Sequence, residues 1–144
     1  MPFLGEYLHN LDQKGRAAIP AKFREKISGG AIITRGLDHC LFVLPQKEWE
    51  VLAGKIIAMP LSKSDSRAFA RLMLSGASDV EFDSQGRILI PEPLRKYASL
   101  TKKIIVTGVY NRIEIWDETE WNKYKKKTES ASDEIAEKLE GLGI

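Results

Sequence analysis

One sequence pattern occurs twice in this chain, and the repeat limits what the chain can fold into more than any other feature. Residues 5–20 read GEYLHNLDQKGRAAIP, and residues 76–91 read GASDVEFDSQGRILIP. Asp12 and Asp83, like the other aligned pairs in these segments, lie 71 residues apart. A period of this length exceeds the roughly 20 to 50 residues of a solenoid repeat, so we interpret it as a duplicated small domain.

The length of the chain bears on how the two copies fold. With 144 residues in total, each copy has only about 70, and a unit of that size buries little core alone. We therefore expect the halves to share one core. No apolar run approaches the roughly 18 residues of a membrane span, and the start of the chain does not resemble a secretory signal. We expect a cytoplasmic protein with no membrane partner.

Residues suited to metal binding or catalysis are sparse. Cys40 is the only cysteine, and His9 and His39 are the only histidines. Their spacing matches no metal site, so we expect neither a metal nor another cofactor. The chain also lacks the Gly-x-Ser-x-Gly, Walker, dinucleotide-binding and His-Glu-x-x-His motifs, and we expect no enzyme activity. His9 aligns with Val80, so we interpret it as a half-buried histidine that faces the core.

Each copy shows the same order of local patterns. Alternating residues at 7, 9 and 11, and again at 78, 80 and 82, predict a strand with one covered face. In the turn that follows, the aspartate is expected to cap the turn and the glycine to adopt a left-handed conformation. A short return strand ends at Pro20 or Pro91, which suit the start of a helix. The expected helices cover residues 21–27 and 92–98, and a second hairpin has strands at 31–34 and 41–44 or at 104–107 and 113–116.

Outside the repeated unit the apolar period becomes helical. The pattern predicts helices over residues 46–57, 67–74, 118–127 and, weakly, 132–139. We expect Ser64 or Asp65 to cap the second helix and Asp117 to cap the third. Trp49 and Trp121 occupy equivalent places, and we interpret both as core residues. We divide the chain into a first domain at residues 5–47, a helical linker at 48–75, a second domain at 76–119 and a helical tail at 120–144.

The repeated pairs Asp12 with Arg16 and Asp83 with Arg87 are the main candidates for function. A short turn separates the members of each pair, which places the two side chains within reach of a charge-assisted hydrogen bond. In one interpretation the pair is a structural clasp that only holds the loop. In the other, the aspartate orients an arginine that the rigid loop presents to phosphate or to a guanine edge.

Further cations accompany these loops, mostly in the first copy. The candidate DNA-contacting residues are Lys14, Arg16, Lys22, Arg24, Arg35 and Arg87, and the candidate loop-orienting residues are Asp12, Gly15, Asp83 and Gly86. In the second copy, glutamine, proline and threonine replace Lys14, Lys22 and Arg35. We therefore expect the first copy to be the main contact surface and the second to be a lesser contact or a packing partner.

The doubled Asp-x-x-x-Arg pattern, with Gly-Glu-Tyr near the start and Glu-Ile-Trp-Asp in the second copy, resembles the MraZ family from Gly5 to about Tyr124. Each half is similar to the AbrB-type domain, whose hairpins are swapped. The resemblance implies an α+β fold in which two tandem AbrB-like swapped-hairpin β-barrel halves, each β-β-α-β-β, share one core with flanking helices.

The same resemblance implies a function. Family members are expected to be nucleoid-associated transcription regulators that bind direct repeats in double-stranded DNA upstream of the division and cell-wall gene cluster, usually their own operon. They are also expected to assemble into ring-like homo-oligomers. The alternative is a non-catalytic assembly module, or an antitoxin-like AbrB-fold protein without promoter specificity.

Overall fold

The structure is a computed structural model that describes residues 2–143. The repeated unit appears in both copies as two strands, a helix and two strands. In the first copy these are β1 (Phe3–Asn10), β2 (Arg16–Ala18), α1 (Ala21–Ile27), β3 (Ala31–Arg35) and β4 (Leu41–Pro45). In the second they are β5 (Ser78–Asp79), β6 (Arg87–Leu89), α4 (Glu92–Tyr97), β7 (Lys103–Tyr110) and β8 (Ile113–Asp117). The expected β-β-α-β-β order is confirmed in both halves.

Strands of the two copies pair with each other. A six-stranded antiparallel sheet has the order β1-β7-β8-β4-β3-β5, and β2 pairs with β6 in a separate two-stranded ribbon. The pairs β1–β7, β4–β8, β3–β5 and β2–β6 all join one copy to the other. Neither half therefore has a sheet of its own, which confirms tandem halves with exchanged strands. The strands described do not close into a barrel, because β1 and β5 are free edges of the larger sheet.

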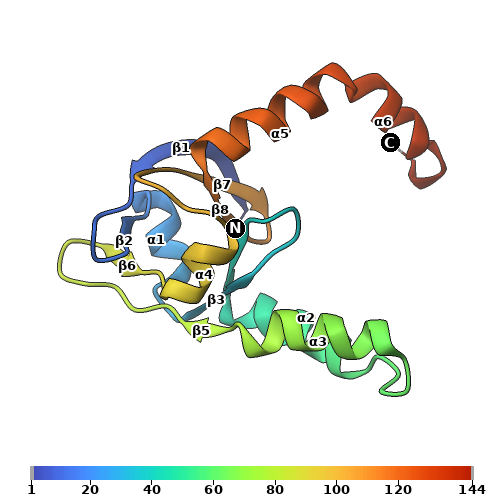
Figure 1. Cartoon of the computed structure of the whole chain (residues 1–144), viewed down its shortest axis with the longest axis horizontal. Helices are drawn as coiled ribbons and strands as arrows, with labels where there is room; N and C mark the ends of the chain where they lie inside the picture. The colour runs from blue at the N-terminus through green and yellow to red at the C-terminus, as the bar shows by residue number, and fades with distance from the viewer. Residues whose placement is uncertain (1, 144) are drawn as a thin grey trace.

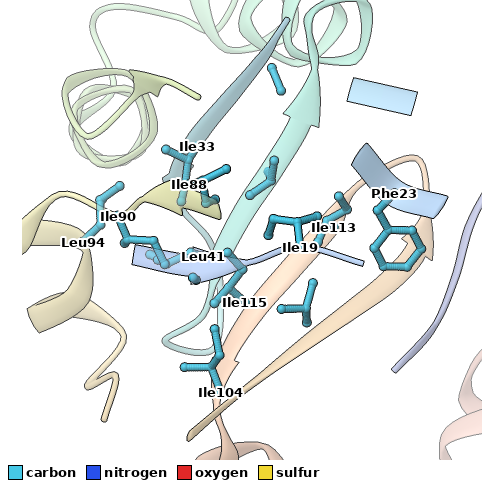
Figure 2. Close-up of a cluster of buried hydrophobic side chains, with 14 of the residues drawn as sticks. Ile19, Phe23, Ile33, Leu41, Ile88, Ile90, Leu94, Ile104, Ile113 and Ile115 are labelled. Atoms are coloured by element: carbon cyan, nitrogen blue, oxygen red, sulfur yellow. The ribbon is translucent and has the colours of Figure 1, made fainter. Parts of the chain in front are cut away.

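The main hydrophobic core is built from both copies. Ile19, Phe23 and Ile33 of the first copy belong to one buried cluster with Ile88, Ile90 and Leu94 of the second, and Figure 2 draws these side chains. Phe23 and Leu94 are 0% and 2% exposed, which confirms that both short helices turn these residues inward. Because each copy supplies part of a continuous cluster, the halves stabilise one another.

A second cluster lies on the other face of the large sheet. Alternate residues of β4 face opposite sides, so Leu41 and Val43 join the main core, whereas Phe42 and Leu44 join the second cluster. The α2 (Gln46–Ile57) and α3 (Ser64–Ser75) helices and the start of α5 (Glu118–Ser130) supply most of the remaining packing. Trp49 and Trp121 both pack here, as expected for core residues.

The helices begin where backbone chemistry allows. Pro20, Pro45 and Pro91 precede α1, α2 and α4 with φ near −55°, at −51°, −56° and −54°, values that suit a helix start. Asp117 caps α5 by accepting from the backbone N–H of Glu120 at 3.3 Å. Neither Ser64 nor Asp65 caps α3, because that helix starts at Ser64 and Lys63 holds the cap position.

Two helical segments project from the β core. Figure 1 shows the α2–α3 hairpin and the α5 helix, with α6 (Ser132–Lys138) beyond it, extending away from the loops that join β1 to β2 and β5 to β6. The final turn is a short 3-10 helix, η1 (Glu140–Leu142), and α6 has no buried residue. No helix among residues 2–143 is both long and apolar enough to cross a bilayer.

Candidate nucleic-acid interface

The two Asp-x-x-Gly-Arg loops have nearly the same geometry. In the first, Oδ1 of Asp12 accepts from the backbone N–H groups of Lys14 and Arg16 at 2.9 and 2.8 Å. In the second, Oδ1 of Asp83 accepts from the N–H groups of Gln85 and Arg87, both at 2.9 Å. One carboxylate oxygen thus satisfies two backbone donors of the turn, as the sequence predicts.

Each aspartate also binds the arginine that ends its loop. Nε of Arg16 donates to Oδ2 of Asp12 at 2.7 Å, and Nε of Arg87 donates to Oδ2 of Asp83 at 2.9 Å. The backbone N–H of the arginine is the largest cause, and its side chain a further one, that holds the pKa of each aspartate below its usual range. Both carboxylates are therefore ionised at neutral pH, and each arginine is oriented by a fixed negative charge.

The two loops flank the same short ribbon. In the antiparallel β2–β6 pair, Arg16 lies opposite Leu89, and Ala18 lies opposite Arg87. Nη1 of Arg87 also reaches Oδ2 of Asp12 at 3.5 Å, which links the two copies across the ribbon. Figure 1 shows both loops together at the end of the molecule away from the helical segments. The structure therefore brings both repeated pairs into one face.

A second pair of arginines covers the loops from the opposite copy. The guanidinium of Arg24 lies over Gly86, where a Cβ atom would stand 2.7 Å from Nη1, and the guanidinium of Arg95 lies in the same way against Gly15. Arg24 also donates to the carbonyl of Ile19 at 3.0 Å. Arg95 is absent from the predicted site, although its spacing of 71 residues from Arg24 identifies it as the equivalent residue.

The glycines of the loops meet two demands. Gly15 and Gly86 have φ of +84° and +74°, a conformation that glycine adopts without the cost of a side chain. They also leave room for the guanidinium groups that lie against them. Their role in orienting the loop therefore includes contact with the other copy.

The remaining predicted cations lie at different places. Lys14 is exposed at the tip of the first loop. Lys22 is exposed on α1, with Nζ 4.9 Å from the ring centroid of Tyr7. Arg35 is the last residue of β3, and its side chain reaches the C-terminal end of α3, where Nη1 donates to the carbonyl of Leu72 at 3.2 Å. The loops thus gather Lys14, Arg16, Arg24 and Arg87, and Arg35 is engaged with a helix end.

Positive charge is concentrated in the segments that form this face. Residues 12–24 and 83–96 together contain seven Lys and Arg and three Asp and Glu. The rest of the chain contains fifteen basic and seventeen acidic residues, so a chain with a net charge of +2 has a basic region and a weakly acidic remainder. Such segregation favours contact between this face and a polyanion.

Other features offer little chemistry. Among residues 2–143, no three His, Cys, Asp or Glu side chains gather to hold a metal ion. Burial raises the pKa of the Cys40 thiol, so this cysteine has little thiolate character. A groove of about 540 Å³ runs beside the first loop, lined by Asn10, Leu11, Asp12, Gln13, Thr101 and Lys102.

Comparison with known proteins gives matches over nearly the whole chain. The family model described as "MraZ protein, putative antitoxin-like" matches residues 2–72 and again 73–141. The chain is 52% identical over 137 residues to "Transcriptional regulator MraZ" of Carboxydothermus hydrogenoformans, covering 95% of this chain and 96% of the relative. It is 51% identical over 142 residues to the protein of that name in Natranaerobius thermophilus, covering 99% of both.

A relative from Limosilactobacillus reuteri with the same name is 53% identical over 136 residues, covering 94% of this chain and 96% of the relative. These names describe regulators and not enzymes, in agreement with the expected lack of enzyme activity. The two successive matches of one family model correspond to the internal repeat.

Proposed function

Because the chain belongs to the MraZ family, we propose that it is a transcription regulator that binds double-stranded DNA through its two Asp-x-x-Gly-Arg loops. The observation that carries this proposal is the position of Arg16 and Arg87 on one ribbon, each held by its own aspartate. The names of the relatives support the regulatory role.

In the proposed complex the arginines face the duplex, and the aspartates act by orienting them. The bond from Arg16 to Asp12 uses Nε, which leaves both Nη groups without a partner among residues 2–143. A guanidinium in this state can bind phosphate or a guanine edge with two parallel hydrogen bonds. Lys14 and Arg24 neutralise nearby phosphates, with Lys22 as an outlying contact, whereas the guanidinium of Arg35 binds the end of α3.

We propose that assembly supplies the affinity that one small face lacks. A ring of copies would place several loop pairs on successive direct repeats, and the second contact would benefit from a high effective concentration. The target would be repeats upstream of the division and cell-wall gene cluster, including the protein's own operon, in the nucleoid. The contact units would be the domains at residues 5–47 and 76–119, with the linker at 48–75 and the tail at 120–144 outside the DNA face.

The test is DNA binding by arginine variants, measured by fluorescence anisotropy with the DNA upstream of the protein's own gene and with a random duplex of equal length. We expect Arg16→Ala and Arg87→Ala each to weaken specific binding by about 10- to 100-fold, as for the loss of one charged contact to DNA. Arg71→Ala is the matched control, since Arg71 is an exposed arginine on α3, and it should bind like the parent.

Salt provides an independent measurement of the same contact. Affinity should fall steeply as salt rises, because contacts to phosphate release counterions, and each arginine variant should have a shallower slope than the parent. If the arginine variants bind as tightly as Arg71→Ala, the loops are not the DNA contact. A parent that shows no preference for the upstream DNA supports the antitoxin-like or assembly alternative.

A further inference from the structure

The outward face of the β2–β6 ribbon carries one large apolar side chain among its polar ones. Ile88 is 0% exposed and belongs to the main core, whereas its neighbour Leu89 is 57% exposed. Successive residues of a strand point to opposite faces, so Leu89 shares the outward face with Arg87. Directly opposite on β2 stands Arg16.

The internal repeat shows that this leucine is an asymmetric feature. Position 89 corresponds to Ala18 at the common spacing of 71 residues. The ribbon therefore presents Arg16 beside a leucine at one end and Arg87 beside an alanine at the other. Because the buried cluster does not include Leu89, core packing does not account for the larger side chain.

The ribbon has the dimensions and chemistry to enter the major groove. Two paired strands are about 4.8 Å apart, and the major groove, about 12 Å wide, admits a two-stranded β-ribbon. An arginine in the groove binds guanine, and an apolar side chain there contacts the C5 methyl group of thymine. The outward face of this ribbon offers both kinds of group side by side.

We propose that the β2–β6 ribbon enters the major groove and that Leu89 determines sequence specificity by packing against the methyl group of a thymine next to the base pair contacted by Arg16. The inference rests on the proposed function, because it assigns the base read at that same site. Ala18, with its single methyl group, makes the weaker contact beside Arg87. The two ends of the ribbon therefore read different bases despite their shared arginine.

The experiment removes the proposed contact between Leu89 and a thymine methyl group, first by changing the DNA and then by changing the protein. A high-affinity duplex is selected with the parent protein from a random library, and each thymine is then replaced by deoxyuridine, which lacks only the C5 methyl group. At one thymine this change should weaken binding of the parent by about fourfold, which is the affinity ratio that corresponds to the free energy of burying one carbon group. Leu89→Ala should bind the unmodified duplex about three- to tenfold more weakly and should be insensitive to deoxyuridine at that thymine.

Two further variants sharpen the test. Leu61→Ala removes a leucine that is 81% exposed between α2 and α3, and it should keep the affinity and the deoxyuridine sensitivity of the parent. Ala18→Leu places a second leucine beside Arg87, and selection with this variant should enrich a thymine at one additional position. Urea unfolding of each variant confirms that the fold is retained.

The outcomes separate this inference from the proposed function. If Leu89→Ala keeps the sensitivity of the parent at every thymine, the inference is wrong, although DNA binding that depends on Arg16 still stands. If the variant instead loses mass in light scattering with its deoxyuridine response unchanged, Leu89 contacts a second copy of the chain, and the inference is also wrong. If the parent enriches no duplex at all, the proposed function and the inference both fail.

Discussion

At the scale of single residues, each loop keeps its shape because one carboxylate accepts hydrogen bonds from several groups of the same loop. Oδ1 of Asp12 accepts two backbone N–H groups, and Oδ2 holds the guanidinium of Arg16. Gly15 completes the turn with a positive φ and accommodates Arg95 of the other copy. The spacing of aspartate, glycine and arginine is thus explained by backbone geometry and by contact between the copies.

A pair of glycine variants tests this explanation. Gly15→Ala should lower the free energy of unfolding by about 1 to 2 kcal/mol, the cost of a left-handed non-glycine residue, and more if Arg95 cannot shift. Gly54→Ala is the matched control, since Gly54 lies within α2 with open space at its Cβ position. It should raise stability by about 0.5 to 1 kcal/mol. Urea unfolding measures both, and equal effects would contradict the explanation.

At the scale of elements, the exchanged strands decide which residues meet. β1 pairs with β7 along its whole length, and His9 lies opposite Ile104. His9 is half-buried, as predicted from its alignment with Val80. Burial lowers the pKa of His9 below the usual histidine value, so the folded protein favours its neutral form.

This pKa gives the stability of the protein a defined pH dependence. Because the folded state binds a proton at His9 less readily than the unfolded state, stability is full above about pH 6.5 and falls as the pH drops toward the folded pKa. Between pH 7.5 and 5.5 the contribution of His9 to this loss is at most about 1.4 kcal/mol. His9→Val should unfold in urea with a smaller pH dependence than the parent, and an unchanged dependence would contradict the assignment.

Local patterns predicted most elements but not how they pair. Pro20 and Pro91 predict where two helices begin, and Asp117 predicts the cap of α5, because the preference of proline and of a capping aspartate for a helix start acts within one turn of the chain. The predicted start of α3 at residue 67 is wrong by about one turn, since the helix already begins at Ser64. Pairing of β2 with β6 has no local pattern, and only the family resemblance indicated exchanged hairpins.

In the candidate site, too, the sequence predicts contacts within one loop but not contacts between the two copies. The bonds between each aspartate and its arginine could be predicted because both residues lie in one short turn. The contact of Arg95 with Gly15 joins residues of different copies, so spacing within one loop could not indicate it. Arg35 shares only its charge with the loop cations, since it ends β3 and its guanidinium binds the end of α3.

At the scale of the whole molecule, the fold separates a basic β face from projecting helices. Both loops lie together at one end, and the α2–α3 and α5–α6 segments extend away from it (Figure 1). The main core, to which both copies contribute, fixes the two copies relative to each other. The proposed DNA contact is therefore one face built from both copies, and it uses Arg16 and Arg87 alike, whereas the sequence alone predicts a lesser role for the second copy.

The most direct test of this claim is hydrogen–deuterium exchange of the parent protein, with and without an excess of its specific duplex. The account predicts that DNA slows exchange in residues 12–18 and 83–89 together, with the α2–α3 hairpin unaffected. Slower exchange in only one of the two loop segments, or in the helical hairpin alone, would contradict it.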